Sequence, residues 1–167
     1  DISHLNFYIM NSHHTVAIGT WEGDKQQSIE YNSSIAVGID CPRAKLRVSI
    51  LLDTIQEYQV RYIFSDEEIS EAVNEAGLII GARGIAYEGV LQRKPVIVVG
   101  EYGFGGLVTP DTLHEQYNNY FRGKINGIKA EYFSLERLEE EIRRGFALTF
   151  QELQMMSNQT IRFLHNI

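Results

Sequence analysis

The alternation of short apolar runs with longer segments of helical periodicity constrains the fold of this chain more than any other feature. The runs are rich in Val and Ile and nearly continuous in apolar character, which is typical of strands buried on both faces of a parallel sheet. We predict strands at residues 5–10, 15–19, 35–39, 60–64, 78–80 and 95–99. Because strands and helices alternate, the sequence predicts an α/β fold with a doubly wound, Rossmann-like and mostly parallel sheet in three α/β/α layers.

Helix start motifs follow most of these strands. Pro42 suits the first helical position after Asp40 and Cys41, and Ser65 followed by Glu68 predicts a capping box. Further helices are predicted to begin at Thr109-Pro110, at Ser134 and near Phe150. The apolar side chains expected to face the core are Leu46, Ile50, Leu51 and Ile55, then Ile69, Ala72, Val73 and Ala76, then Leu135, Leu138, Ile142 and Phe146, and finally Leu153, Met156 and Leu164.

Length, charge and cysteine content narrow the class of protein. The 167 residues, 44% of them hydrophobic and 22% charged, suit one soluble globular domain over residues 1–167. The net charge of −7 argues against a broad surface for nucleic acid or an anionic membrane, so any phosphate must be bound locally. No apolar run approaches the ~18 residues of a membrane span. The single cysteine, Cys41, agrees with a reducing compartment, and we expect a cytoplasmic location.

The loops that follow the predicted strands are the candidate sites, because ligands of doubly wound sheets bind beyond the carboxyl ends of the strands. In "GARG", Gly81 and Gly84 would let the backbone approach a ligand, and the helix that follows would present free N–H groups to a phosphate. Arg83 could add a forked, charge-assisted contact. The alternative is a tight turn whose glycine only permits close packing.

The segment "GEYGFGGLVTP" is the second candidate loop, predicted over residues 100–109. Gly103, Gly105 and Gly106 fall within four residues, and the backbone amides of such a loop could form an anion-binding nest. The alternative is a flexible surface loop without a ligand.

Two charged residues complete the candidate set. Glu88 lies on the otherwise apolar helix "IAYEGVLQ", where it could accept hydrogen bonds from ribose hydroxyls or simply face solvent. Lys25 follows an earlier strand in "TWEGDKQ" and could reach a diphosphate, although a surface lysine is the simpler interpretation. The sequence shows no spacing typical of a metal site, no nucleophile elbow of the Gly-x-Ser-x-Gly kind and no Gly-Lys-Ser/Thr phosphate loop.

Taken in order, four segments resemble the C-terminal, sugar-nucleotide-binding lobe of glycosyltransferases with the two-lobed B-type fold (GT-B, group 1). "IAVGIDCPRAKLR" is similar to the family's strand that ends in Gly-Asp-Gly-Pro, and "VRYIFSDEEISEAVNEAGLIIG" resembles its next strand, acidic helix and strand. "YEGVLQRKPVIVVG" is similar to the Glu-Ala-x-Ala-x-Gly-x-Pro-Val-Ile stretch, and "GGLVTPDTLHE" to its Gly-rich loop before a proline and a helix.

This resemblance implies a donor-binding role in a bacterial-type enzyme of polysaccharide biosynthesis. The lobe would bind a nucleoside-diphosphate sugar such as a UDP-sugar, and the enzyme would transfer the sugar to an acceptor hydroxyl. By the resemblance, Glu88 would bind the donor ribose, and Gly81 and Arg83 would face the sugar and the diphosphate. The glycines of residues 103–106 would supply amides to the diphosphate, and Lys25 would balance its charge.

The resemblance also implies a missing half. The chain begins at Asp1 rather than Met, and we expect it to be the C-terminal half of a larger two-lobed enzyme. The acceptor would bind an N-terminal lobe or a partner chain, and any peripheral membrane association would come through that lobe alone. No cofactor, metal or nucleic-acid partner is expected, and no catalytic residue is assigned.

Departures from the family pattern keep two other functions open. Many retaining members carry a second glutamate two turns before the ribose-binding one, whereas this chain has Ile80-Gly81 there, so retaining and inverting chemistry both stay open. A sugar-nucleotide epimerase of the same fold is one alternative. The other is a non-catalytic α/β module that binds a small ligand or a partner protein.

Overall fold

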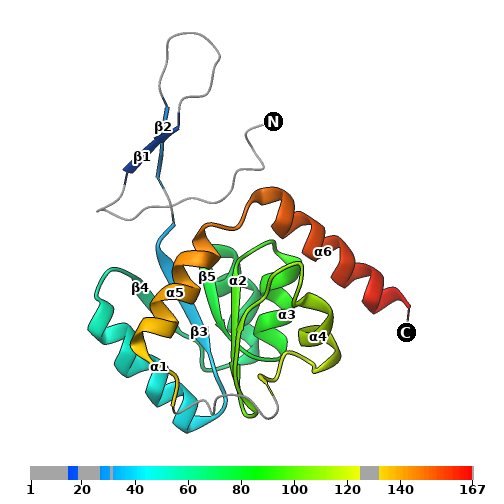
Figure 1. Ribbon diagram of the computed structural model, residues 1–167, viewed down its shortest axis with the longest axis horizontal. Helices are drawn as coiled ribbons and strands as arrows, with labels where there is room; N and C mark the ends of the chain where they lie inside the picture. Colours follow the sequence, from blue (N-terminus) through cyan, green and yellow to red (C-terminus); the bar gives the residue numbers. More distant parts are fainter. Residues whose placement is uncertain (1–14, 19–26, 31, 125–131, 167) are drawn as a thin grey trace.

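The computed structural model describes residues 15–18, 27–30, 32–124 and 132–166, and of the first two ranges only the backbone. Its centre is a five-stranded sheet with the strand order β4-β3-β5-β6-β7 (Figure 1). The first four of these strands are mutually parallel, and β7 runs antiparallel to β6. The strands are β3 (Ser34–Gly38), β4 (Gln59–Tyr62), β5 (Leu78–Gly81), β6 (Val96–Gly100) and β7 (Gly103–Leu107). The predicted α/β, mostly parallel fold is confirmed.

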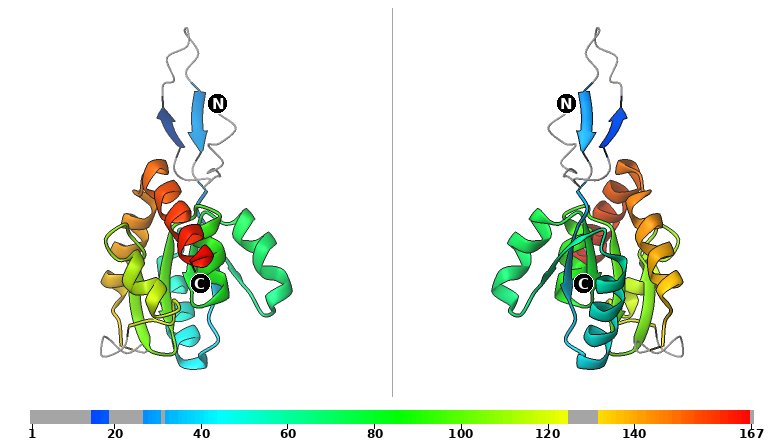
Figure 2. Two further views of the ribbon diagram at one scale, coloured as in Figure 1. Left: turned by 90° about the vertical axis from the view of Figure 1, so that its right-hand side faces the viewer. Right: turned by 90° about the vertical axis from the view of Figure 1, so that its left-hand side faces the viewer.

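Helices cover both faces of this sheet and form the outer layers (Figure 2). One face packs against α1 (Pro42–Ile55) and α5 (Leu135–Phe146). The other face packs against α2, α3, α4 and α6, and a short 3-10 turn, η2 (Asp66–Glu68), precedes α2. These four helices are α2 (Ile69–Glu75), α3 (Gly84–Leu91), α4 (Leu113–Asn118) and α6 (Phe150–His165).

Both faces of the central strands are buried, which is why their sequences are almost continuously apolar. In β5, Leu78 and Ile80 point into the core under α1 and α5, whereas Ile79 points into the core under α2 and α3. Because all three side chains are fully buried, a polar residue is tolerated on neither side of the strand.

The order of the strands creates a switch point between β3 and β5. The connection that follows β3 runs through α1 on one face, and the connection that follows β5 runs through α3 on the opposite face. The two helices therefore diverge from neighbouring strand ends, and a crevice opens between them in folds of this kind.

One predicted strand lies in a different sheet. Residues 15–19 were expected in the parallel sheet, but β1 (Thr15–Ile18) pairs antiparallel with β2 (Gln27–Glu30) in a separate two-stranded sheet. This part of the prediction is wrong because an apolar run identifies a strand without naming its partner, and a nearby strand can pair with it through a short connection. The strand predicted at residues 5–10 lies outside the described residues.

The inward face of α1 was also predicted wrongly in part. Leu46 and Ile50 are 61% and 51% exposed, and the buried residues are Ala44, Val48, Leu51 and Leu52. These four recur at intervals of four, three and one along the helix, so they share one face, while Leu46 lies about 200° around from Ala44.

The predicted helix caps had mixed outcomes. Ser134 caps α5 by accepting a hydrogen bond from the Arg137 amide at 3.1 Å, as predicted. The Ser65 side chain donates to the Glu68 carboxylate but accepts no backbone N–H, so the predicted capping box is not formed. An unpredicted capping box joins Thr149 to Glu152 at the start of α6.

Candidate functional site

A cleft of about 320 Å³ opens at the switch point, where three parallel strands end. Residues 40–41 after β3, residues 82–83 after β5 and residues 100–101 after β6 line it, together with Arg122 from the segment that follows α4. The bends after β5 and β6, which the sequence marks as candidate loops, therefore converge on one cavity. Its size is at the lower end of the range typical of small-molecule sites, about 300–1,000 Å³.

Arg83 reaches this cleft from a strained turn between β5 and α3, residues 82–83, which we call the elbow. Strand β5 passes into α3 almost without a loop, and Arg83 adopts φ 56° and ψ −125°. Its amide donates to the Phe121 carbonyl at 2.9 Å, which fixes the turn, while the side chain is 50% exposed. A non-glycine residue in such a conformation costs about 1–3 kcal/mol, and strain of this kind concentrates at functional sites.

Arg122 is brought to the same cleft by its neighbour. Phe121 is fully buried, packs edge-to-face on Tyr87 at 4.7 Å and anchors the chain after α4 against the sheet. The Arg122 carbonyl accepts a hydrogen bond from the Tyr102 amide at 3.2 Å, so the backbone is tied to the turn between β6 and β7. The guanidinium lies 5.2 Å from the ring of Tyr120, which is exposed.

One carboxylate faces both arginines. Glu101 forms an ion pair with Arg83, and its Oε1 lies 3.7 Å from Arg122 Nε. The hydrogen bond to Glu101, followed by the charge of the same carboxylate, raises the pKa of the Arg83 guanidinium. At 3.7 Å the contact with Arg122 is too long for a hydrogen bond, and the buried Nε of Arg122 has no hydrogen-bond partner within the described part of the chain.

The helices that begin at this cleft differ from α2, α4, α5 and α6, each of which has an acidic residue in its first turn. Neither α1, capped by Cys41, nor α3, capped by Arg83, has a side-chain cap or an acidic residue in its first turn. Helices α5 and α6 have both. Because a helix N-terminus carries partial positive charge, the two ends at the cleft favour an anion.

The glycines of "GARG" divide between two roles. Gly81 is buried and pairs with Gly38 of β3, and an added Cβ would lie 2.6 Å from Ile85 Cγ2 and closer still to the Gly38 carbonyl. The packing interpretation therefore accounts for Gly81. Gly84 is exposed, and an added Cβ would meet only Ile69 Cδ1 at 3.8 Å, so packing does not require glycine there.

Glu88, which was predicted as part of the same site, does not line this cleft. Glu88 accepts a hydrogen bond from Gln92 Nε2 at 2.7 Å, and the same nitrogen donates to the Ser70 carbonyl at 3.2 Å, which joins α3 to α2. Glu88 is among the lining residues of neither described cleft. Lys25 lies outside the described residues.

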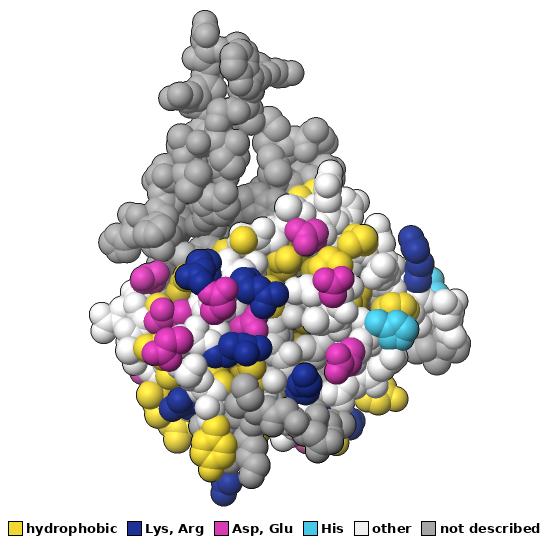
Figure 3. All heavy atoms as spheres, in the orientation of Figure 1, with side chains coloured by type: hydrophobic (Ala, Val, Ile, Leu, Met, Phe, Trp, Pro, Cys, Tyr) yellow, Lys and Arg dark blue, Asp and Glu magenta, His cyan; other side chains and the backbone are white. Residues whose placement is uncertain are grey.

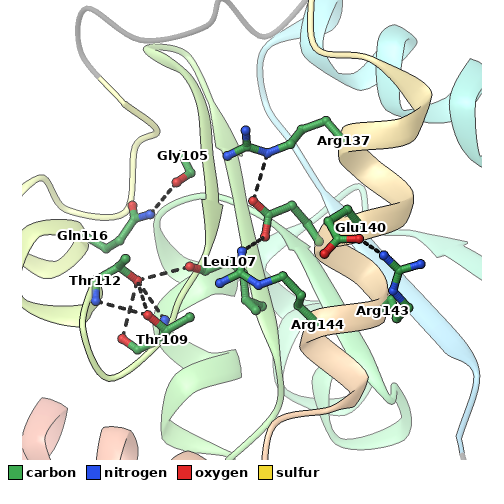
Figure 4. Close-up of polar contacts among 10 residues, drawn as sticks. Gly105, Leu107, Thr109, Thr112, Gln116, Arg137, Glu140, Arg143 and Arg144 are labelled. Carbon is green, nitrogen blue, oxygen red and sulfur yellow. Dashed lines mark hydrogen bonds and ion pairs between the residues drawn. The ribbon is translucent and has the colours of Figure 1, made fainter.

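The second glycine-rich segment is a strand rather than a loop, so the predicted loop at residues 100–109 is wrong. Gly103, with φ 124°, is in close contact with Gly123, and Gly106, with φ 82°, leaves room for the Glu141 carboxylate. Gly105 is the extra residue of a β-bulge, and its carbonyl accepts from Gln116 Nε2 at 2.9 Å (Figure 4). Each glycine is matched by a group of the protein itself.

Gly105 borders a second, larger cleft of about 730 Å³. Polar side chains of α4 and its flanks line it, among them Thr112, Gln116 and Asn119. Arg83 and Gly105 consequently belong to different clefts, although the resemblance assigns both to one donor site.

Sequence reasoning missed Glu101 and Arg122 as site residues. Glu101 follows directly on the last glycine of a predicted strand, and that position alone could have identified it. No local pattern marks Arg122, because the buried Phe121 and the return of the chain from α4 decide where it lies.

On the face drawn in Figure 3, Lys and Arg side chains are interleaved with Asp and Glu, so no field of one sign covers it. Across the described ranges, no three or more His, Cys, Asp or Glu side chains gather closely enough to hold a metal ion. None of the helices there is both long and apolar enough to cross a membrane. Comparisons with family models, curated proteins and solved structures gave no match for this chain.

Proposed function

We propose that the switch-point cleft binds the diphosphate of a nucleoside-diphosphate sugar, and that the chain is the donor-binding part of a glycosyltransferase. The observation that carries the proposal is Arg83, an arginine kept on a strained elbow at the rim of this cleft. Glycine would adopt that backbone conformation with less strain. The presence of arginine therefore indicates that its guanidinium group has a function. Planar guanidinium groups match phosphate oxygens in a forked geometry.

The cleft would serve the leaving group of sugar transfer. As the acceptor hydroxyl attacks the anomeric carbon, the bond to the nucleoside diphosphate breaks and negative charge grows on its terminal phosphate. Arg83, Arg122 and the N-termini of α1 and α3 would stabilise that charge, and fixed donors of this kind typically make the greatest single contribution to rate enhancement. The acceptor and any general base would come from another part of the enzyme.

One feature of the cleft argues against the epimerase, and a second favours a nucleotide over other ligands. An epimerase needs acid and base groups at the sugar, and among the described lining residues the carboxylates are Asp40 and Glu101, with no histidine. Tyr102 and Tyr120 are exposed beside Arg122 and offer faces on which a nucleobase can stack.

Thermal unfolding in the presence of nucleotides tests the proposal. A ligand at a hundred times its Kd adds about 2.7 kcal/mol of stability, which for a domain of this size raises Tm by about 5–11 °C. We expect such a shift with millimolar UDP, GDP or a sugar derivative of one of them, and its loss in Arg83→Ala. Arg162→Ala, a matched loss of charge on α6, should keep the shift.

Cys41 provides a second, direct readout, since the only cysteine of the chain lines the cleft. Bound nucleotide should slow its alkylation by iodoacetamide, which mass spectrometry measures as one added label. A flat Tm with every nucleotide together with unprotected Cys41 would contradict nucleotide binding and favour a non-catalytic module.

A further inference from the structure

We infer that Glu101 competes with the anion for this cleft: its carboxylate pairs with the arginines and must be displaced when a phosphate binds. The inference rests on the proposed function, because it concerns the same cleft. It assigns Glu101 a role in selectivity: ligands with two or more negative charges displace it more readily than singly charged ones do.

The position of the carboxylate supports this role. Glu101, Arg83 and Arg122 come from three separate segments, and the carboxylate lies where an anion shared by both guanidinium groups would lie. One carboxylate does not satisfy them both, since Arg122 Nε has no hydrogen-bond partner among the described residues. A diphosphate has more acceptor oxygens and more charge, and could serve both arginines at once.

Comparison with Glu141 indicates that Glu101 is free to leave. Glu141 also lies between two arginines, Arg137 at 3.1 Å and Arg144 at 3.0 Å, but it is only 2% exposed and is enclosed between α5 and β7 (Figure 4). Glu101 is 42% exposed and lies on the turn that joins β6 to β7. Each cluster consists of one carboxylate between two arginines. The cluster at Glu141 is buried and structural, whereas the contacts of Glu101 lie at the cleft, where a ligand can replace them.

The Glu101 carboxylate weakens the binding of an anion in two ways. A ligand must replace its contact with Arg83, and the negative charge repels a phosphate that approaches. Because the pair is exposed, each effect is modest, and together we expect them to change Kd about two- to fivefold at low salt.

Isothermal titration of pyrophosphate and UDP into the full chain and its Glu101→Gln variant tests the inference. The variant should bind both ligands about two- to fivefold more tightly, and the gain should shrink towards 1 M NaCl, where the screening length falls to about 3 Å. Dimethyl phosphate, with a single negative charge, should bind both proteins more weakly than pyrophosphate does, and its Kd for the variant should also be lower by about two- to fivefold. Glu136→Gln, the same change of charge on an exposed helix position that lines neither cleft, should leave every Kd unchanged.

The outcomes separate the inference from the proposed function. Weaker binding by Glu101→Gln would show that Glu101 contacts the ligand, and unchanged binding would show that it does not compete; either result overturns the inference while nucleotide binding stands. If neither protein bound pyrophosphate or UDP, although thermal unfolding showed both to be folded, the proposed function itself would fail.

Discussion

The two glycine-rich segments of this chain look alike in sequence and behave differently in the fold. Gly81–Gly84 ends a parallel strand, bends sharply and presents Arg83 to a cleft. The segment 100–106 turns back on itself and adds an antiparallel strand, β7, to the edge of the sheet. Arg83 lines the cleft from the first segment and Glu101 from the turn of the second, whereas the glycines of β7 pack against the protein itself.

The contrast shows what a glycine indicates. A missing Cβ shows that something approaches the backbone closely, but not whether it is a ligand or the protein. In β7 the approaching groups are Gly123, Gln116 and Glu141. At Gly81 it is the neighbouring strand, and at Gly84 no protein group comes close. Substitutions in and around the two segments test this division.

Replacement of Gly81 should have the largest effect. In Gly81→Ala the new Cβ would clash with the Gly38 carbonyl and with Ile85, and two paired strands cannot separate without loss of their hydrogen bonds. Overpacking usually costs about 1–3 kcal/mol, and we expect about 3 kcal/mol or more here because part of the clash is with backbone. Urea unfolding at constant m-value measures it.

Gly84→Ala is the matched control within the same motif. Space is available, and alanine favours a helix over glycine, so stability should stay equal or rise by up to about 1 kcal/mol. If Gly81→Ala and Gly84→Ala lost equal amounts of stability, Gly81 and Gly84 would not have different roles in the fold.

Gly106→Ala should cost about 2 kcal/mol, because alanine is strained at φ 82° and its Cβ would lie 3.2 Å from Glu141 Oε1. The Kd for pyrophosphate should stay within about twofold, a change smaller than any single charged contact would cause. Titration of pyrophosphate into the folded variant measures this Kd. A tenfold increase would show that the glycines of β7 belong to the binding site, as the resemblance implies.

Glu141→Gln should destabilise the β7 side of the molecule by about 1–2 kcal/mol, since the buried carboxylate accepts charge-assisted hydrogen bonds from Arg137 and Arg144. Glu140→Gln, which removes an exposed pair with Arg143 one residue earlier on α5, should cost about 0.5 kcal/mol or less. Denaturant unfolding of both variants gives the comparison. Similar losses would mean that burial of Glu141 does not strengthen its contacts.

The smallest difference that we expect concerns the elbow. Arg83→Gly should be about 1 kcal/mol more stable than Arg83→Ala, because glycine adopts the observed φ and ψ with less strain, partly offset by its greater freedom in the unfolded chain. Both variants should lose the nucleotide-induced rise in Tm. If alanine proved the more stable, the elbow would not be strained, and the main support for a functional Arg83 would disappear.

Most of the fold followed from local patterns, and the errors have a common cause. The four parallel strands of the sheet were located within one or two residues. For β3, β5 and β6 the reason is that burial on both faces leaves a continuous apolar run, whereas the edge strand β4 is only partly buried. Strand β7 was missed because Gly-Phe-Gly-Gly-Leu lacks the β-branched residues that identify strands, and its stability comes from pairing with β6. The site divides similarly: Arg83 follows a recognisable strand end, whereas Arg122 is placed by contacts distant in sequence.

Local sequence was sufficient for the α/β class, the alternation of the elements and the carboxyl ends of the strands as the place where a cleft opens. These features follow from the apolar periodicity of each segment and from the direction of the chain, and both can be read from local sequence. Tertiary contacts were needed to show that Glu101 and Arg122 meet Arg83, that Glu88 faces α2 and that the glycines of β7 pack against the protein. A tertiary contact depends on two segments that are distant in sequence. The local pattern of one segment does not show which residues of the other will pack against it.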